Sequence, residues 1–295
     1  MTWEIHDGEK GVDIVRYAHS LSDFDTLRPH ASNRDHDVAR RVFNGVDDGV
    51  GSAFGGGFVT LSDYLGFARR GWPEGLARMR EILGELSFPR ATSIKRRPVW
   101  SDEGDDVDMG RVYAGDLERA WRRTVRKNAT APQHLRIWTS CSYPGYTSPD
   151  KFFWRGAVAC VLSDALEEAG YRVQINCHSA SLGLYTERVS LLSGHRFDGF
   201  MALKLKDYDQ PLLLEQVAAT TAHAGFLRVA FFAAELSHHG PAIPHMGRSG
   251  VFETPEKLPL AEDGDIVIDK VSDEDGARKK IREIMARFQK EEVPT

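Results

Sequence analysis

HLRIWTS (134–140) and YRVQINCH (171–178) flank the segment 150–169, and these three stretches decide the fold. The first has the apolar character of a buried strand, and the second alternates strictly between apolar and polar residues. The middle segment carries a wide apolar stripe, follows Pro149 and stops at Gly170, as is typical of a helix. A strand, a helix and a strand in quick succession form a βαβ unit, so the two strands are expected to be parallel.

The rest of the C-terminal part continues this alternation of strands and helices. Strands are predicted at 184–193, 200–206 and 265–270, and helices at 212–224 and from Ser272 onward. The run 226–236 is so uniformly apolar that it fits a helix or a strand. Residues 131–295 are therefore predicted to form an α/β domain, with a mixed, mostly parallel sheet flanked by helices in a three-layer sandwich.

Residues 1–130 carry less periodic signal. Two short helices are predicted, from Ser62 to Arg70 and from Pro73 to about Glu85, and few other positions show an apolar rhythm. We therefore expect an irregular, α-rich N-terminal part that is separate from the α/β domain.

The charges are close to balance, because 38 Lys and Arg stand against 43 Asp and Glu, for a net charge of −5. This balance argues against a protein that coats nucleic acid. It hides an alternation: the segment 87–100 has four basic residues, 101–108 has five acidic residues, and 109–127 has six basic and two acidic residues. Any electrostatic function is therefore expected in the N-terminal part.

The last of these segments contains the nucleic-acid candidates. Leu117, Trp121 and Val125 recur every four residues and predict a helix. Its opposite face presents four arginines, Arg119, Arg122, Arg123 and Arg126. A solvated surface is the favoured interpretation of this face, and nucleic acid is not expected as a partner.

Several classes of protein are disfavoured by missing motifs. The three cysteines, Cys141, Cys160 and Cys177, include no Cys-x-x-Cys pair. Cys160 and Cys177 fall at apolar positions of periodic segments and are read as small buried apolar residues, and a reducing cytoplasm fits this usage. No secretion signal is visible, and no apolar run approaches the roughly 18 residues of a membrane span. Complete metal, phosphate-binding and dinucleotide motifs are absent as well. We therefore expect no cofactor, no metal, no membrane and a cytoplasmic location.

The candidate site residues follow from the position of the strands. Ligands of open α/β sheets bind beyond the carboxyl ends of strands. The polar residues at such positions are Thr139, Ser140, Ser142, His178, Asp207 and Asp209. They are candidates for contact with a ligand or a protein partner, and no residue is assigned a catalytic role.

The order of buried strand, polar loop, long helix and antiparallel excursion resembles a von Willebrand factor A-type domain over residues 131–270. That family places Asp-x-Ser-x-Ser in the first loop, where it holds a magnesium ion between the protein and its ligand. This chain reads Thr-Ser-Cys-Ser-Tyr at 139–143, without the aspartate. The resemblance therefore implies the fold but not the metal site.

A second resemblance covers most of the chain from residue 60 onward. The strings GWPEG (71–75), WRGAVACVLSDALEEAGYRVQI (154–175), LKLKDYDQPLLL (203–214) and GFLRVAFF (225–232) are similar to a family of uncharacterised proteins encoded by phages and prophages. This resemblance implies no activity. It implies a phage product that acts in the host cytoplasm or within the virion.

Two hypotheses follow. The first is a non-enzymatic interaction module of phage origin, a scaffold, adaptor or virion component, with other proteins or copies of itself as partners. The alternative is a hydrolase or a nucleic-acid-processing enzyme. It requires that at least two of the polar candidates line one pocket, with His238 and His239 counted among them.

Overall fold

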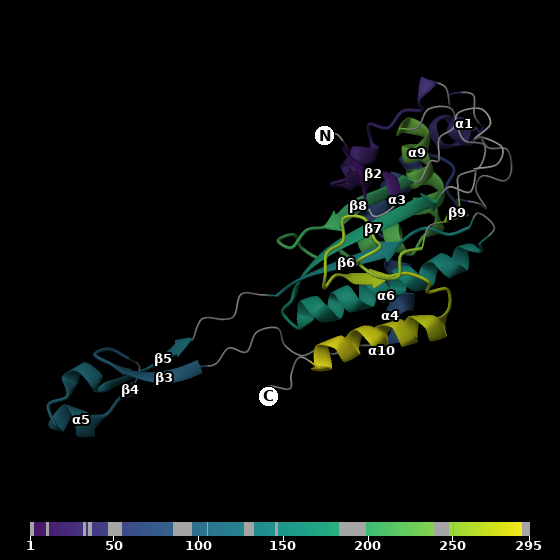
Figure 1. Cartoon of the computed structure of the whole chain (residues 1–295). Coiled ribbons are helices and arrows are strands. Elements are labelled where there is room, and N and C mark those ends of the chain that lie inside the picture. The colour runs from purple at the N-terminus through teal and green to yellow at the C-terminus, as the bar shows by residue number, and fades with distance from the viewer. Residues whose placement is uncertain are drawn as a thin grey trace.

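The protein is described by a computed structural model over residues 3–9, 12–31, 34, 37–46, 55–84, 96–104, 106–126, 133–144, 147–182, 199–238, 248–249 and 251–290. Its largest element is a mixed sheet (Figure 1). The sheet contains, in spatial order, β1 (Glu4–Glu9), β2 (Val12–Ala18), β8 (Gly199–Lys206), β7 (Arg172–Leu182), β6 (His134–Ser140) and β10 (Ile266–Ile268). A two-residue strand, β9 (Arg248–Ser249), pairs with the end of β7.

The βαβ unit is present as the sequence predicts. β6 and β7 pair in parallel from His134 opposite Arg172 to Ser140 opposite His178. The helix α6 (Pro149–Glu168) connects them. β10 extends the sheet in parallel on the other side of β6, and β8 runs antiparallel to β7. The α/β class with a mixed, mostly parallel sheet is therefore confirmed, while the strand predicted at 184–193 lies outside the described residues.

The N-terminal residues form part of this sheet, which their weak periodicity did not predict. β1 and β2 form an antiparallel hairpin, and β2 pairs in parallel with β8 from Ile14 opposite Gly199 to Ala18 opposite Leu203. The sequence EIHDGE of β1 has one large apolar residue, Ile5, which is exposed. Pairing with an existing sheet, not a local apolar rhythm, makes this segment a strand.

One face of the sheet carries the helices that pack against it. Along β7, Val173, Ile175 and Cys177 point to this face and belong to two adjoining apolar clusters. The helices that supply these clusters are α6, α1 (Asp37–Asn44), α3 (Leu61–Arg70), α4 (Pro73–Leu83), α8 (Leu214–Thr221), α9 (Phe232–His238) and α10 (Glu274–Lys290). The predicted helices at 62–70 and 73–85 are thus present as α3 and α4.

The opposite face is covered differently from the expected sandwich. Trp138, Ala180 and Phe200 on this face pack against Phe252 and Leu258. Both partners belong to the irregular segment 251–265, so among the described residues the third layer is a loop and not a helix. This segment contains two prolines, whose missing N–H groups and fixed rings oppose a helix.

The run 226–236 is helical. A π-helical segment, η4 (Phe226–Phe231), continues directly into α9. No single helix in the described part of the chain is long and apolar enough to cross a membrane, although α8 and the helix over Phe226–Ser237, bent by 65°, together meet the length and composition of a span. Much of this pair, including Phe226 and Phe231, is buried in the core.

A second, smaller sheet lies apart from the first in Figure 1. We call residues 96–126 the arm. It contains β3 (Arg96–Ser101), β4 (Asp106–Val107), α5 (Met109–Tyr113), the 3₁₀ turn η3 (Leu117–Arg119) and β5 (Trp121–Arg126), with strand order β3, β5, β4. The boundary predicted at residue 130 falls between the arm and β6.

The helix predicted across residues 117–126 is wrong. η3 ends at Arg119, and the chain then becomes the central strand β5, which pairs with β3 and β4. Because Arg119 ends the 3₁₀ turn and Arg122 lies within the strand, the predicted helical row of arginines does not form. The apolar spacing of four is also an even number, and alternation in a strand satisfies it equally.

Candidate functional site

The loop after β6 gathers the candidates from the strand ends. Thr139, Ser140, Ser142 and His178 are all buried, and Ser140 lies directly opposite His178 in the sheet. The Ser142 hydroxyl accepts a hydrogen bond from the Ala180 N–H at 2.7 Å. The structure therefore brings these residues together, but within the interior and not on an open wall.

A buried arginine from α6 organises this cluster. The Arg155 guanidinium donates to the Ser140 hydroxyl at 3.0 Å and to the Ser142 carbonyl at 2.7 Å. Its other terminal nitrogen lies 3.3 Å from an Asp269 carboxylate oxygen, and the guanidinium carbon lies 3.8 Å from the centre of the Tyr143 ring. One cation thus links the loop after β6 to the residue that follows β10.

Asp269, like Arg155, makes several contacts within the chain. Its carboxylate accepts hydrogen bonds from the backbone N–H groups of Phe252 at 2.9 Å and Lys270 at 2.7 Å. Burial raises the pKa of Asp269, and the nearby Arg155 charge opposes that shift. Asp269 also borders a cavity of about 600 Å³ at the start of α10.

The cluster does not fit the magnesium ion that the von Willebrand A-type resemblance would suggest. Hard cations bind carboxylate, hydroxyl and carbonyl oxygens, which here are Asp269, Ser140 and the Ser142 carbonyl. These oxygens already contact the positively charged Arg155. A divalent ion at the same oxygens would face a second cation, so the residues present do not suit it.

His178 has an unusual environment for a titratable group. Its ring stacks on Phe200 with centroids 5.3 Å apart and meets Phe252 edge-on at 5.9 Å. Neither ring nitrogen has a hydrogen-bond partner among the described residues. Burial, aided by the Arg155 charge, lowers the pKa of His178 to about 3, so the ring is neutral at physiological pH. It is not hydrogen-bonded to Ser140 as a general base would be.

Asp207 and Asp209 lie at the opposite edge of the sheet. Because β8 runs antiparallel to β7, its carboxyl end lies beside the start of β7. Asp207 accepts a hydrogen bond from Lys204 at 2.6 Å, which lowers the pKa of Asp207, and Asp209 is exposed in the following turn. The two aspartates therefore do not join the buried cluster. The side chains of His238 and His239 lie outside the described residues.

A bulge in β8 separates two lysines that the sequence places on one face. The register with β7 shifts between Ile175 and Asn176, so Lys206 turns to the helix side. The Lys206 ammonium is buried, donates to the Val173 carbonyl at 2.7 Å and lies 2.8 Å from Glu167. Lys204 stays on the other face.

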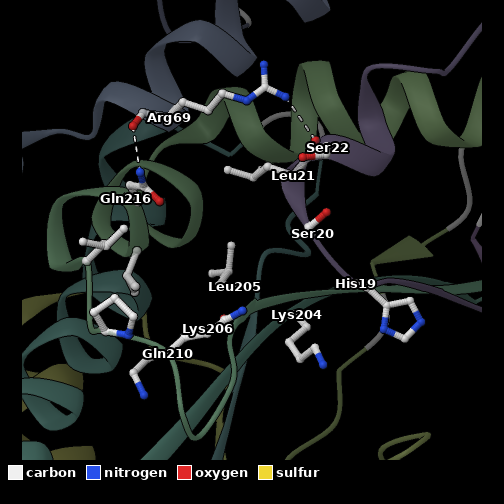
Figure 2. A pocket seen from close by; sticks show the side chains of 13 residues that line it. His19, Ser20, Leu21, Ser22, Arg69, Lys204, Leu205, Lys206, Gln210 and Gln216 are labelled. Atoms are coloured by element: carbon white, nitrogen blue, oxygen red, sulfur yellow. Dashed lines mark hydrogen bonds between the residues drawn. The ribbon is translucent and has the colours of Figure 1, made fainter. Parts of the chain in front are cut away.

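An open cavity of about 400 Å³ lies beside the end of β8, near Lys204 and Lys206 (Figure 2). It is bordered by the end of β8, by the residues after β2 and by the start of α8. None of the six candidates from the strand ends lines it, although Lys204, the partner of Asp207, does. Sequence reasoning missed this site because its walls come from four separate segments of the chain.

The arm has a different kind of surface. Five large apolar side chains on it are exposed: Trp100, Met109, Tyr113, Leu117 and Trp121. Ala120 is the one buried residue among the arm side chains that the structure describes. Arg119 and Arg122 are exposed there too, while the side chains of Arg123 and Arg126 lie outside the described set.

Arg155 and Asp269 are the main residues that the sequence reading passed over. The signal for Arg155 was a lone charged residue within the apolar stripe of a long helix, because a buried charge requires a partner. Nothing in the sequence near Asp269 identifies Arg155 as that partner.

The comparisons with known proteins found one family. Neither the curated proteins nor the solved structures include a match to the chain. A family model described as a domain of unknown function (DUF7192) matches residues 8–292, which is nearly the whole chain and includes both the sheet and the arm. The chain therefore belongs to the DUF7192 family.

Proposed function

We propose that this protein is a non-enzymatic protein-interaction module that associates with a second copy of itself through the arm. The observation that carries the proposal is the concentration of exposed apolar side chains there. Five of the nine large apolar side chains that are exposed among the described residues lie between 100 and 121. Such patches on soluble proteins are typical of interaction surfaces.

Among the arm side chains that the structure describes, there is no apolar interior. A sheet of three short strands needs an apolar face packed against something to be stable in water. Within the described arm, one small residue, Ala120, is buried, and no arm residue belongs to the three apolar clusters of the main body. Burial against another chain would supply the missing apolar contact.

A second copy is favoured as the partner because the arm carries both signs of charge. An acidic segment, 101–108, lies between the basic segments 87–100 and 109–127. In a two-fold symmetric interface each patch meets its own counterpart, so a patch with both charges can complement itself. An excess of one sign would instead repel a second copy.

The proposal extends to a phage setting. The similarity of several segments to phage-encoded proteins supports a module that acts in the host cytoplasm or as a subunit of the virion. The buried, internally paired cluster around Arg155 supports a structural role more than a catalytic one. A von Willebrand A-type relationship of the main sheet remains part of the same proposal.

The test is the mass of the protein in solution. Sedimentation equilibrium of the full chain should give an average mass above the 33.0 kDa of one copy, rising with concentration. The double variant Tyr113→Ser with Leu117→Ser removes two side chains that are 84% and 60% exposed, so it should shift the mass towards 33.0 kDa.

Ile5→Ser is the matched control, since Ile5 is 62% exposed but lies in the main sheet. It should associate like the unmodified chain. A chain that stays at 33.0 kDa at every concentration contradicts the proposal, as does a double variant that associates as strongly as the control.

A further inference from the structure

A methionine belongs to the exposed apolar surface of the arm. Met109 and Tyr113 stand one helical turn apart, so their side chains lie on the same face of α5. Met109 is 50% exposed and Tyr113 is 84% exposed, and Leu117 in the following turn is exposed as well. In Figure 1, α5 lies at the tip of the arm. Met109 is therefore part of the surface through which the arm is proposed to associate.

Met109 has the one exposed thioether among the methionines that the structure describes. Met79 and Met201 are buried in the core, and Met285 is partly buried against it. An oxidant dissolved in water therefore reaches the sulfur of Met109 more readily than the sulfurs of these three residues.

The cysteine thiols are poor competitors for the same oxidant. All three are buried. Burial raises the pKa of Cys160 to about 12 and raises the pKa of Cys177 as well, so both thiols stay protonated at neutral pH. A buried, protonated thiol reacts slowly with peroxides, because the thiolate is the nucleophile.

Peroxides convert a thioether into a sulfoxide. The sulfur bonds to one oxygen of hydrogen peroxide or of an organic peroxide, the O–O bond breaks, and the other oxygen leaves as water or an alcohol. The sulfur gives up two electrons, which the peroxide accepts. A flexible apolar side chain thereby becomes a polar one.

A sulfoxide at Met109 is unfavourable in the proposed interface. Its oxygen accepts hydrogen bonds from water while the arm is free, and it loses them when apolar side chains cover this surface. Burying a polar group without a new partner weakens binding by about tenfold. The group occurs twice in a two-fold symmetric dimer, so the dissociation constant should rise about a hundredfold.

We propose that Met109 is a modification site through which peroxides control the self-association of the arm. The inference rests on the proposed function, and it adds that oxidation of this one sulfur separates the two copies. The change is reversible, because methionine sulfoxide reductases return the sulfoxide to the thioether. Two thiols supply the electrons and form a disulfide, and the oxygen leaves as water.

Sedimentation equilibrium of the full chain before and after treatment with hydrogen peroxide tests the inference, with mass spectrometry of its peptides to locate the added oxygen. The treated chain should carry the oxygen at Met109 and associate about a hundredfold more weakly than the untreated chain. Incubation with the reductases for both sulfoxide epimers and a dithiol should restore association. Met109→Gln places a permanent amide at this position, so without any oxidant it should associate as weakly as the oxidised chain.

Met109→Leu and Met285→Leu are the matched variants, and each is compared with itself before and after peroxide. Both lose one thioether and keep an apolar side chain of similar volume. Peroxide should leave the affinity of Met109→Leu unchanged. It should separate Met285→Leu as it separates the unmodified chain, because Met285 lies in α10 of the main body. Met1 and Met246, which lie outside the described residues, are present in both variants.

Association itself should shield the site. Met109 should be oxidised more slowly at concentrations where the chain is associated than where it is a single copy. Oxidation of Met285 should not depend on concentration.

Three results overturn the inference while self-association stands. They are an affinity that does not change once Met109 carries the oxygen, a Met109→Leu variant that peroxide still separates, and a Met109 that is oxidised no faster than Met285 in the single copy. A chain that is a single copy at every concentration before treatment contradicts the proposed function, and the inference is then wrong as well.

Discussion

At the scale of single residues, Arg155 makes the loop after β6 a structural element of the interior. Buried hydroxyls and a buried carboxylate at the end of parallel strands resemble a site that awaits a ligand. Here the guanidinium supplies the donors for Ser140, Ser142 and Asp269 from within the chain. A buried cation and a buried anion that are paired with good geometry give the loop one defined conformation, because separating them would leave an uncompensated charge.

His178 gives the protein a predictable sensitivity to acid. The pKa of its ring is about 3 in the folded chain and about 6.5 in the unfolded chain. As the pH falls, His178 takes up a proton in the unfolded chain at a higher pH than in the folded chain. The stability that the neutral, buried ring contributes is therefore fully present above pH 6.5 and is lost as the pH falls towards 3. Between pH 8 and pH 5 the loss is about 2 kcal/mol in the free energy of unfolding.

His178→Phe should remove most of that loss, because phenylalanine keeps the stack on Phe200 and has no proton to bind. Denaturant unfolding of both proteins at pH 8 and pH 5 measures the difference. Phe200→Leu changes the same packing but keeps the histidine, so it should lower stability at both pH values and preserve the acid effect. An equal acid effect in His178→Phe would show that other groups cause it.

At the scale of elements, a glycine sets the distance between α6 and α8. A Cβ atom on Gly156 would lie 2.3 Å from the Ala222 Cβ and 2.4 Å from the Ala222 backbone nitrogen. The backbone of one segment therefore touches the other, and no side-chain rotation can make room. The long, nearly fully buried α6 packs closely at the end of α8 because this position lacks a side chain.

Gly156→Ala should therefore destabilise the protein by about 1–3 kcal/mol, the usual cost of overpacking a core. Gly66 is the matched control in the interior of α3, where an added Cβ would meet the flexible end of Arg70 at 3.4 Å. There the helix preference of alanine should dominate, and Gly66→Ala should gain about 0.5–1 kcal/mol. Thermal or denaturant unfolding of the two variants checks the opposite signs. If both variants lose stability equally, the close approach at Gly156 is not the cause.

The secondary structure of β5 could not be predicted from its local sequence. Its sequence has apolar residues spaced by four, which an amphipathic helix and a strand both allow. Trp121, Thr124 and Val125 prefer strands, but the preference is small compared with the gain from pairing on both sides with β3 and β4. The partners lie in a separate stretch of the chain, so a window around β5 does not contain the information.

At the scale of the whole molecule, the main body and the arm have different sources of stability. The three apolar clusters connect β2, the helices and the βαβ unit around one sheet. None of them includes any of the arm residues whose side chains the structure describes. The body should therefore keep its fold when the arm is removed.

Replacing residues 96–126 with a flexible Gly-Ser linker of equal length tests this independence. The midpoint of thermal unfolding of the body should change by no more than a few degrees, because its buried contacts remain. Removing residues 1–18 is the informative contrast, since it deletes β2, exposes the edge of β8 and takes Val15 and Ala18 from the core. That truncation should lose the cooperative transition, and a large loss on removal of the arm would mean that arm and body fold together.

The sequence by itself determined the βαβ unit, the ends of its helix, α3, α4 and the final helix, since each of these is expressed by the periodicity and capping residues of one continuous stretch. It also placed Ser140 and His178 among the polar residues at the strand ends, and the structure shows them opposite each other. Only the tertiary structure decided that 4–9 and 12–18 join the sheet, that 121–126 is a strand, and that Asp207 lies away from the buried cluster. Burial of one face produces an apolar periodicity that can be read in each segment separately. The pairing of distant strands, and of charges such as Arg155 and Asp269, depends instead on which segments meet in three dimensions.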